Sequence, residues 1–116
     1  MDNRELGKLG EQRAREFLKK LGYQIVTTNY YTRAGEIDII AKDRESFVFV
    51  EVKTRTDTKH GYPEMNVHAK KLWHFKNAVQ IYVLQNNIRN PFRLDVISVD
   101  LSGEKSEFMH FKNITV

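Results

Sequence analysis

A charged hairpin near the middle of the chain constrains the fold most. Asp38 lies in a run of alternating polar and apolar residues, and Glu51, Val52 and Lys53 end a second run, rich in the β-branched and aromatic residues that strands favour. The charged segment 42–45 between the runs predicts a turn, which sets Asp38 roughly opposite Glu51. Because side chains alternate between the faces of a strand, Glu51 and Lys53 point the same way and Val52 points away. Two carboxylates and an ammonium group therefore converge on one face, an arrangement that suits a hard divalent cation.

The patterns on either side of this hairpin predict an α/β protein with a mixed sheet flanked by helices. The expected elements, in chain order, are helix 4–21, strand 23–31, the two hairpin strands, polar loop 54–64, helix 66–87 and strand 93–100, with a further strand optional at 105–115. Gly22 is the expected C-terminal stop of the first helix. The predicted order is αβββαβ.

Composition agrees with a small basic domain. The 116 residues leave room for one domain, expected to span residues 1–116. The chain has no cysteine, so neither disulfides nor thiolate ligands can hold it, and a cytoplasmic location is expected. The charged N-terminal segment lacks a signal core, and no apolar run approaches the ~20 residues that cross a bilayer, so no membrane partner is expected. The net charge of +4 permits a nucleic-acid partner without requiring one.

An ordered set of motifs extends over residues 6–99. In chain order it comprises Gly10-Glu11, Gly22-Tyr23, Asn29, Gly35-Glu36-Ile37-Asp38, the run 49–55, Lys71 with Ala78, and the run 93–97. This order resembles the YraN-like family of bacterial proteins. The spacing of Asp38, Glu51 and Lys53 is similar to that of the PD-(D/E)xK nuclease superfamily, and the chain further resembles its Holliday junction resolvase-type members. Ile37 stands where the superfamily name has a proline, a residue that carries no chemistry. The resemblance implies a restriction-endonuclease-like fold.

The resemblance also implies roles in metal binding and catalysis for four residues of the hairpin. Asp38 and Glu51 are the expected ligands of Mg²⁺ or Mn²⁺, with the backbone carbonyl of Val52 as a third oxygen. Lys53 is expected to orient the attacking water or to offset developing negative charge. On spacing alone, the alternative is a solvated surface pair worth less than about 1 kcal/mol.

Three further residues are candidate supports of this site. Glu11 lies at the margin of the first helix's apolar stripe and is expected either near the metal or on the helix surface. Glu36 points to the same face as Asp38, as an extra ligand or as a solvated glutamate. Lys71 lies within the apolar stripe of the second helix, where it either binds a substrate phosphate or covers the core with its stem.

A basic rim brackets the hairpin in sequence. Arg33, Arg55, Lys59 and His60 can follow a phosphate backbone, although each taken singly is more often a plain surface residue. Trp73 lies outside the second helix's stripe, and packing under the C-terminal segment is the favoured interpretation over base stacking or a dimer contact.

Together these patterns favour a cytoplasmic, metal-dependent nuclease that hydrolyses phosphodiester bonds in DNA. So small a domain has little surface for base-specific grooves, which favours structure-selective cutting of branched or single-stranded DNA. One alternative is a catalytically inactive nucleic-acid-binding module of the same fold. A second is a protein-interaction adaptor, which would bind no metal and be insensitive to salt. A homodimer is compatible with these patterns, and so is a monomer.

Overall fold

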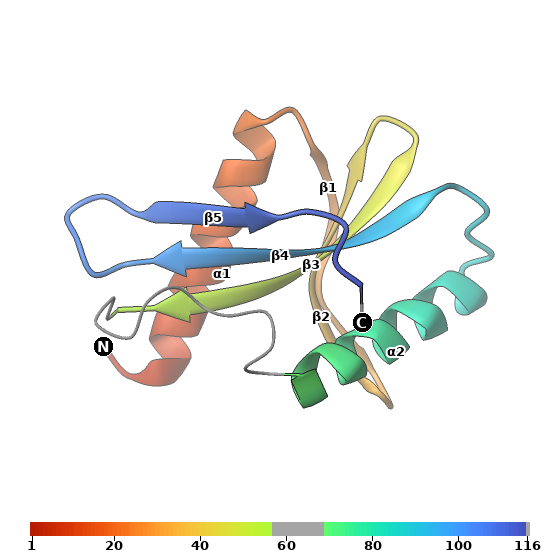
Figure 1. Ribbon diagram of the computed structural model, residues 1–116, viewed down its shortest axis with the longest axis horizontal. Coiled ribbons are helices and arrows are strands. Elements are labelled where there is room, and N and C mark those ends of the chain that lie inside the picture. Colours follow the sequence, from red (N-terminus) through yellow and green to blue (C-terminus); the bar gives the residue numbers. More distant parts are fainter. Residues whose placement is uncertain (57–68, 116) are drawn as a thin grey trace.

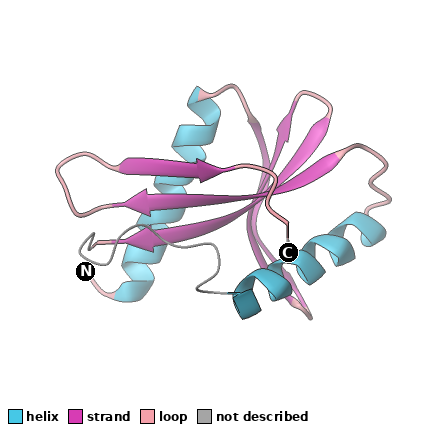
Figure 2. Ribbon diagram, viewed as in Figure 1, coloured by secondary structure: helices cyan, strands magenta, loops and turns pink. Residues whose placement is uncertain are grey.

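The chain forms a five-stranded mixed sheet with two helices packed against it (Figure 1). The computed structural model describes residues 1–56 and 69–115. The elements are α1 (Asn3–Lys20), β1 (Gln24–Thr32), β2 (Gly35–Asp43), β3 (Ser46–Arg55), α2 (Ala69–Gln85), β4 (Phe92–Asp100) and β5 (Glu107–Phe111). The strands lie in the order β1-β2-β3-β4-β5. Only the β3–β4 neighbours are parallel, with α2 as the crossover between them (Figure 2). The predicted αβββαβ order is confirmed, and the optional last strand is present as β5.

Local signals fix both ends of α1. The Asp2 carboxylate accepts a hydrogen bond from the Glu5 amide at 2.8 Å, which caps the N-terminus. At the other end Gly22 adopts φ +93°, and its amide donates to the Lys19 carbonyl at 3.0 Å. A left-handed residue of this kind suits glycine and ends the helix where the sequence predicts.

Alternation along β3 divides the core into two layers. Val48, Val50 and Val52 pack on the side of α1, where Ala14 and Leu18 meet them. Phe47 and Phe49 point to the other side and pack against α2. Each face of the sheet therefore buries its apolar side chains under one helix, and α1 and α2 lie on opposite sides of β3.

The sheet divides between β2 and β3. Their ladder runs from the hairpin turn, which follows Asp43 as predicted, to the pair Ile39–Val50 and ends there. Beyond that pair β2 continues beside β1 as far as Gly35, while β3 continues beside β4 as far as Arg55. Figure 1 shows the two strands diverging past this point. The sheet therefore opens next to Asp38 and Glu51.

The exposed face of α2 corrects one prediction. Trp73 is 58% exposed, and Leu84, eleven residues along the helix, is 76% exposed. The C-terminal segment instead packs toward β4, where the Ile114 amide donates to the Leu94 carbonyl at 2.8 Å. Packing of Trp73 beneath that segment is therefore wrong. Neither helix in the described ranges is both long and apolar enough to span a bilayer.

Candidate functional site

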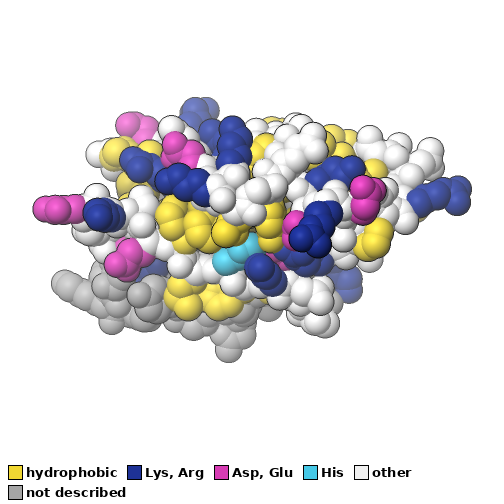
Figure 3. All heavy atoms as spheres, turned by 90° about the horizontal axis from the view of Figure 1, so that it is seen from above, with side chains coloured by type: hydrophobic (Ala, Val, Ile, Leu, Met, Phe, Trp, Pro, Cys, Tyr) yellow, Lys and Arg dark blue, Asp and Glu magenta, His cyan; other side chains and the backbone are white. Residues whose placement is uncertain are grey.

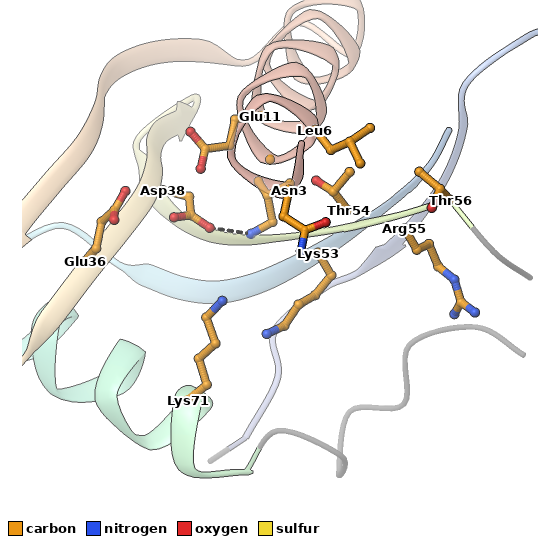
Figure 4. Close-up of a pocket in the computed structure, with 12 residues that line it drawn as sticks. Asn3, Leu6, Glu11, Glu36, Asp38, Lys53, Thr54, Arg55, Thr56 and Lys71 are labelled. Carbon is orange, nitrogen blue, oxygen red and sulfur yellow. Dashed lines mark hydrogen bonds between the residues drawn. The ribbon is translucent and has the colours of Figure 1, made fainter. Parts of the chain in front are cut away.

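A cavity of about 510 Å³ lies where the sheet opens. Its walls come from the N-terminal half of α1, the first part of β2, the end of β3 and one residue of α2 (Figure 4). Polar and charged side chains from all four elements face it. Residues far apart in sequence thus meet in one pocket.

Three carboxylates gather on one wall of this cavity. Glu11 comes from α1, and Glu36 and Asp38 come from β2. One carboxylate oxygen of each lies within 4.8 Å of those of the other two. Burial raises the pKa of Glu11, as do the nearby Asp38 and Glu36 charges, against the opposing hydrogen bond from Asn29. Like charges held this close and partly desolvated favour a bound cation or proton.

Asn29 joins two of these carboxylates. Its side-chain amide donates to Glu11 Oε1 at 2.9 Å and to Glu36 Oε1 at 2.8 Å. Asn29 lies in β1 with φ +51°, a left-handed conformation that asparagine tolerates better than most residues. The sequence analysis placed Asn29 among the family motifs but did not predict that it would connect these two carboxylates.

Asp38 is buried beside Glu51, which the predicted register placed opposite it. Asp38 Oδ2 accepts a hydrogen bond from the Val52 amide at 2.8 Å, drawn as the dashed line in Figure 4. Burial, followed by the hydrogen bond and the repulsion from Glu51, raises the pKa of Asp38 to about 9. In the metal-free protein this shift favours the protonated form of Asp38 at neutral pH. Glu51 itself is 2% exposed, whereas its neighbours Val52 and Lys53 line the cavity.

A glycine contact places the first helix against the sheet. A Cβ atom on Gly10 would lie 1.9 Å from Thr54 Oγ1, a distance that side chains do not reach. Glycine therefore lets the backbone of α1 lie directly on β3. Glu11 follows at once and is held at the cavity wall as a result. This contact explains why Gly10 and Glu11 occur together.

Two lysines face the carboxylates across the cavity (Figure 4). Burial lowers the pKa of Lys53, and the nearby Lys71 ammonium lowers it further, against the attraction of Glu51. Lys71 reaches the cavity from the start of α2 and is solvent-exposed. Lys71 therefore lies at the site, and its binding of a substrate phosphate stays a prediction.

The predicted basic rim is only partly assembled. Arg55 lines the cavity. Arg33 is exposed in the turn between β1 and β2 and is not among the residues that line the cavity. Lys59 and His60 lie outside the described residues, as does the rest of the range 57–68.

Asp95 belongs to a separate buried network. It accepts hydrogen bonds from Arg93 Nε at 3.1 Å and from the Asn113 amide at 2.9 Å, and its carboxylate lies 2.7 Å from His110 Nε2. Burial would raise the pKa of Asp95, but these hydrogen bonds outweigh it and lower the pKa. The network ties β4 to the C-terminal strand and does not line the cavity.

Fold and site define an α/β protein with an acid cluster and two lysines at a break in its sheet. The model of the family described as "Uncharacterised protein family UPF0102" matches residues 10–99. A UPF0102 protein of Caldicellulosiruptor saccharolyticus is 45% identical over 85% of both chains. One of Carboxydothermus hydrogenoformans is 38% identical over 98% of both. One of Alkaliphilus oremlandii is 43% identical over 96% of this chain and 97% of its own. The chain therefore belongs to the UPF0102, or YraN-like, family.

Proposed function

We propose that this protein is a metal-dependent nuclease that hydrolyses phosphodiester bonds, with DNA as its substrate. The observation that carries the proposal is the convergence of Glu11, Glu36 and Asp38 within 4.8 Å, facing Lys53 and Lys71 in one cavity. The arrangement is similar to that of the PD-(D/E)xK superfamily of restriction-endonuclease-like nucleases, in which carboxylates and a lysine act together.

The donor set fits a hard cation. All three clustered side chains offer oxygen, the ligand type that Mg²⁺ and Mn²⁺ prefer. Burial and mutual repulsion raise the pKa of Glu11 and of Asp38. The raised pKa values mean that the cluster favours uptake of positive charge, whether a proton or a cation. Asp38 would be the central ligand, with Glu11 and Glu36 facing the cavity and Glu51 and the Val52 carbonyl completing the predicted set. When bound, the cation would polarise the phosphodiester and lower the pKa of water.

The basic side chains would position the substrate. Lys71 and Arg55 would hold the phosphates on either side of the scissile bond, by charge and without reading the bases. Lys53 lines the same cavity, where its amine would hold the attacking water or contact the developing negative charge. Its lowered pKa, caused first by burial, makes proton exchange at the amine easier than at an exposed lysine.

Cleavage assays with matched variants test the proposal. Labelled single-stranded, duplex, flap and four-way-junction DNA, and RNA, are incubated with Mg²⁺, Mn²⁺ or EDTA. Asp38→Asn, Glu51→Gln and Lys53→Met should each lower the cleavage rate at least about 100-fold. Glu45→Gln in the exposed hairpin turn and Lys19→Met on α1 make the same chemical changes away from the cavity and should leave the rate unchanged.

Two other outcomes are informative. Metal-dependent binding without cutting would favour the inactive nucleic-acid-binding module of the same fold. Cutting that survives both Asp38→Asn and Glu51→Gln would mean that the activity does not arise at this site. Size-exclusion chromatography with light scattering of the same samples would test the homodimer prediction.

A further inference from the structure

A second groove, of about 310 Å³, continues from the acid cluster toward the edge strand β1. It lies between α1 and β1, and it shares Asn3, Gly7, Glu11 and Glu36 with the first cavity. What it adds is Arg4 and Lys8 from α1 and Asn29 and Tyr31 from β1. A nucleic-acid strand held at the carboxylates could therefore continue along the groove between α1 and β1.

Tyr31 presents an aromatic ring to water at this groove. Its side chain is 74% exposed. The preceding Tyr30 packs edge-on against Tyr82 of α2, with ring centroids 4.9 Å apart, so it serves the core on the other side of the sheet. The fold thus uses one tyrosine of the pair for packing and leaves the other in the groove.

Arg4 and Lys8 place two cations beside that ring. They lie one turn apart on α1, in line with Glu11, and both are exposed. Like charges four residues apart weaken a helix, and a cation in the first turn opposes the helix dipole. Neither makes an ion pair with a carboxylate in the part of the chain that the structure describes. Their position is unfavourable for α1 alone and favourable for an anionic ligand.

We infer that this groove binds an unpaired nucleotide next to the phosphodiester held at the acid cluster. Tyr31 stacks on the base, and Arg4 and Lys8 contact the adjoining phosphates. A duplex covers the faces of its bases by stacking within the helix, so only a single-stranded segment can use the ring. The inference rests on the proposed function and deepens it, because it assigns selectivity for unpaired strands to one side chain.

Lysine and arginine charge does not by itself distinguish one form of nucleic acid from another. On the face shown in Figure 3, lysine and arginine side chains are scattered among acidic and apolar ones and are not gathered into one patch. Charge spread in this way attracts any nucleic acid without selecting its form. Selection among forms therefore needs a contact such as the one that Tyr31 offers.

Equilibrium binding in EDTA tests the inference without turnover. Short labelled single strands of DNA and RNA, and a DNA duplex of the same sequence, are titrated with the full chain. Tyr31→Ala should weaken single-strand binding about 10-fold and duplex binding less than about 2-fold, the range expected for loss of one stacked base. Tyr31→Phe keeps the ring and should bind like the wild type. Trp73→Ala removes an exposed aromatic ring of α2 and serves as the matched control.

The contribution of Arg4 and Lys8 is measured by the salt dependence of binding. Arg4→Gln combined with Lys8→Gln should weaken binding of both forms and reduce the salt dependence of single-strand binding by about two ions. The inference would be overturned if Tyr31→Ala lost equal affinity for single strand and duplex, or lost no affinity for single strands. It would also be overturned if the wild type did not bind single strands. Binding that depends on Tyr31 in a protein without nuclease activity would refute only the proposed function. Cleavage unaffected by Tyr31→Ala on single-stranded substrates would refute only the inference.

Discussion

Replacing Gly10 by alanine tests the contact that brings α1 to the site. In a helix interior this change ordinarily stabilises a protein by about 1 kcal/mol, because glycine loses more backbone entropy on folding. Here the new methyl group would lie 1.9 Å from Thr54 Oγ1 and 2.9 Å from two Thr54 carbons. Overpacking costs about 1–3 kcal/mol, and a clash this close belongs at the upper end. We therefore expect Gly10→Ala to be less stable than wild type by about 2 kcal/mol.

The same helix offers a matched control. Nothing lies within 4 Å of a Cβ atom built on Gly7, one turn earlier. Gly7→Ala should therefore show the ordinary gain of about 1 kcal/mol. The free energy of unfolding of both variants is measured by urea titration. Calorimetric titration with Mn²⁺ then reports whether displacement of α1 in Gly10→Ala also moves Glu11 and weakens binding.

A double variant separates the clash from other effects. Thr54→Ala removes the hydroxyl and the methyl group, two of the three atoms nearest to the Gly10 position. Added to Gly10→Ala, it should restore part of the lost stability and of the Mn²⁺ affinity. If Gly10→Ala proved as stable as Gly7→Ala, α1 would not pack on β3 at this point, and the explanation for the position of Glu11 would fail.

Three further changes probe the charges. Burial and Glu51 raise the pKa of Asp38 from 3.8 to about 9. The proton on Asp38 therefore stabilises the metal-free fold fully below pH 3.8, and this stabilisation is lost as the pH rises toward 9. Urea unfolding with EDTA at pH 5 and 8.5 should show this loss of unfolding free energy in the wild type and not in Asp38→Asn. Asn29→Gly keeps the left-handed backbone but removes the amide that orients two carboxylates, and calorimetry should show Mn²⁺ affinity reduced about 10–100-fold. Asp95→Asn breaks a buried charge network and should lower the free energy of unfolding by about 3 kcal/mol. Its Mn²⁺ affinity should equal that of the wild type, and a lower affinity would connect Asp95 to the site.

Those parts of the fold that local chemistry determines were predictable from sequence. Alternation and the charged turn predicted the β2–β3 hairpin, and the register placed Asp38 beside Glu51 as found. Gly22 predicted the end of α1 for a reason that operates within one turn of the helix. Each of these signals depends on residues close together in the chain.

Other parts of the site depend on contacts between distant elements. Glu11 reaches Glu36 because Gly10 lets α1 lie on β3, and no periodicity in α1 specifies that crossing point. Asn29 in β1 bonds to Glu11 of α1 and to Glu36 of β2, so its contact with both carboxylates depends on how three elements pack and could not be derived from its identity. Trp73 was misplaced for the same reason, since a helical wheel shows which residues share a face but not what covers that face.

The break in the sheet explains why a carboxylate occupies position 38. Once β2 leaves β3 beyond Ile39, the buried amide of Val52 needs another acceptor, and Asp38 supplies it at 2.8 Å. One side chain therefore satisfies the backbone where the ladder ends and contributes charge to the cluster. An alanine at position 38 would remove both contributions, so its effects on folding and on metal affinity could not be told apart. Asparagine keeps an oxygen acceptor for the amide, but it replaces the second carboxylate oxygen by an NH2 group that cannot ligate a cation. Any loss of Mn²⁺ binding in Asp38→Asn with the fold intact therefore measures what the carboxylate gives the cation, as ligand and as charge.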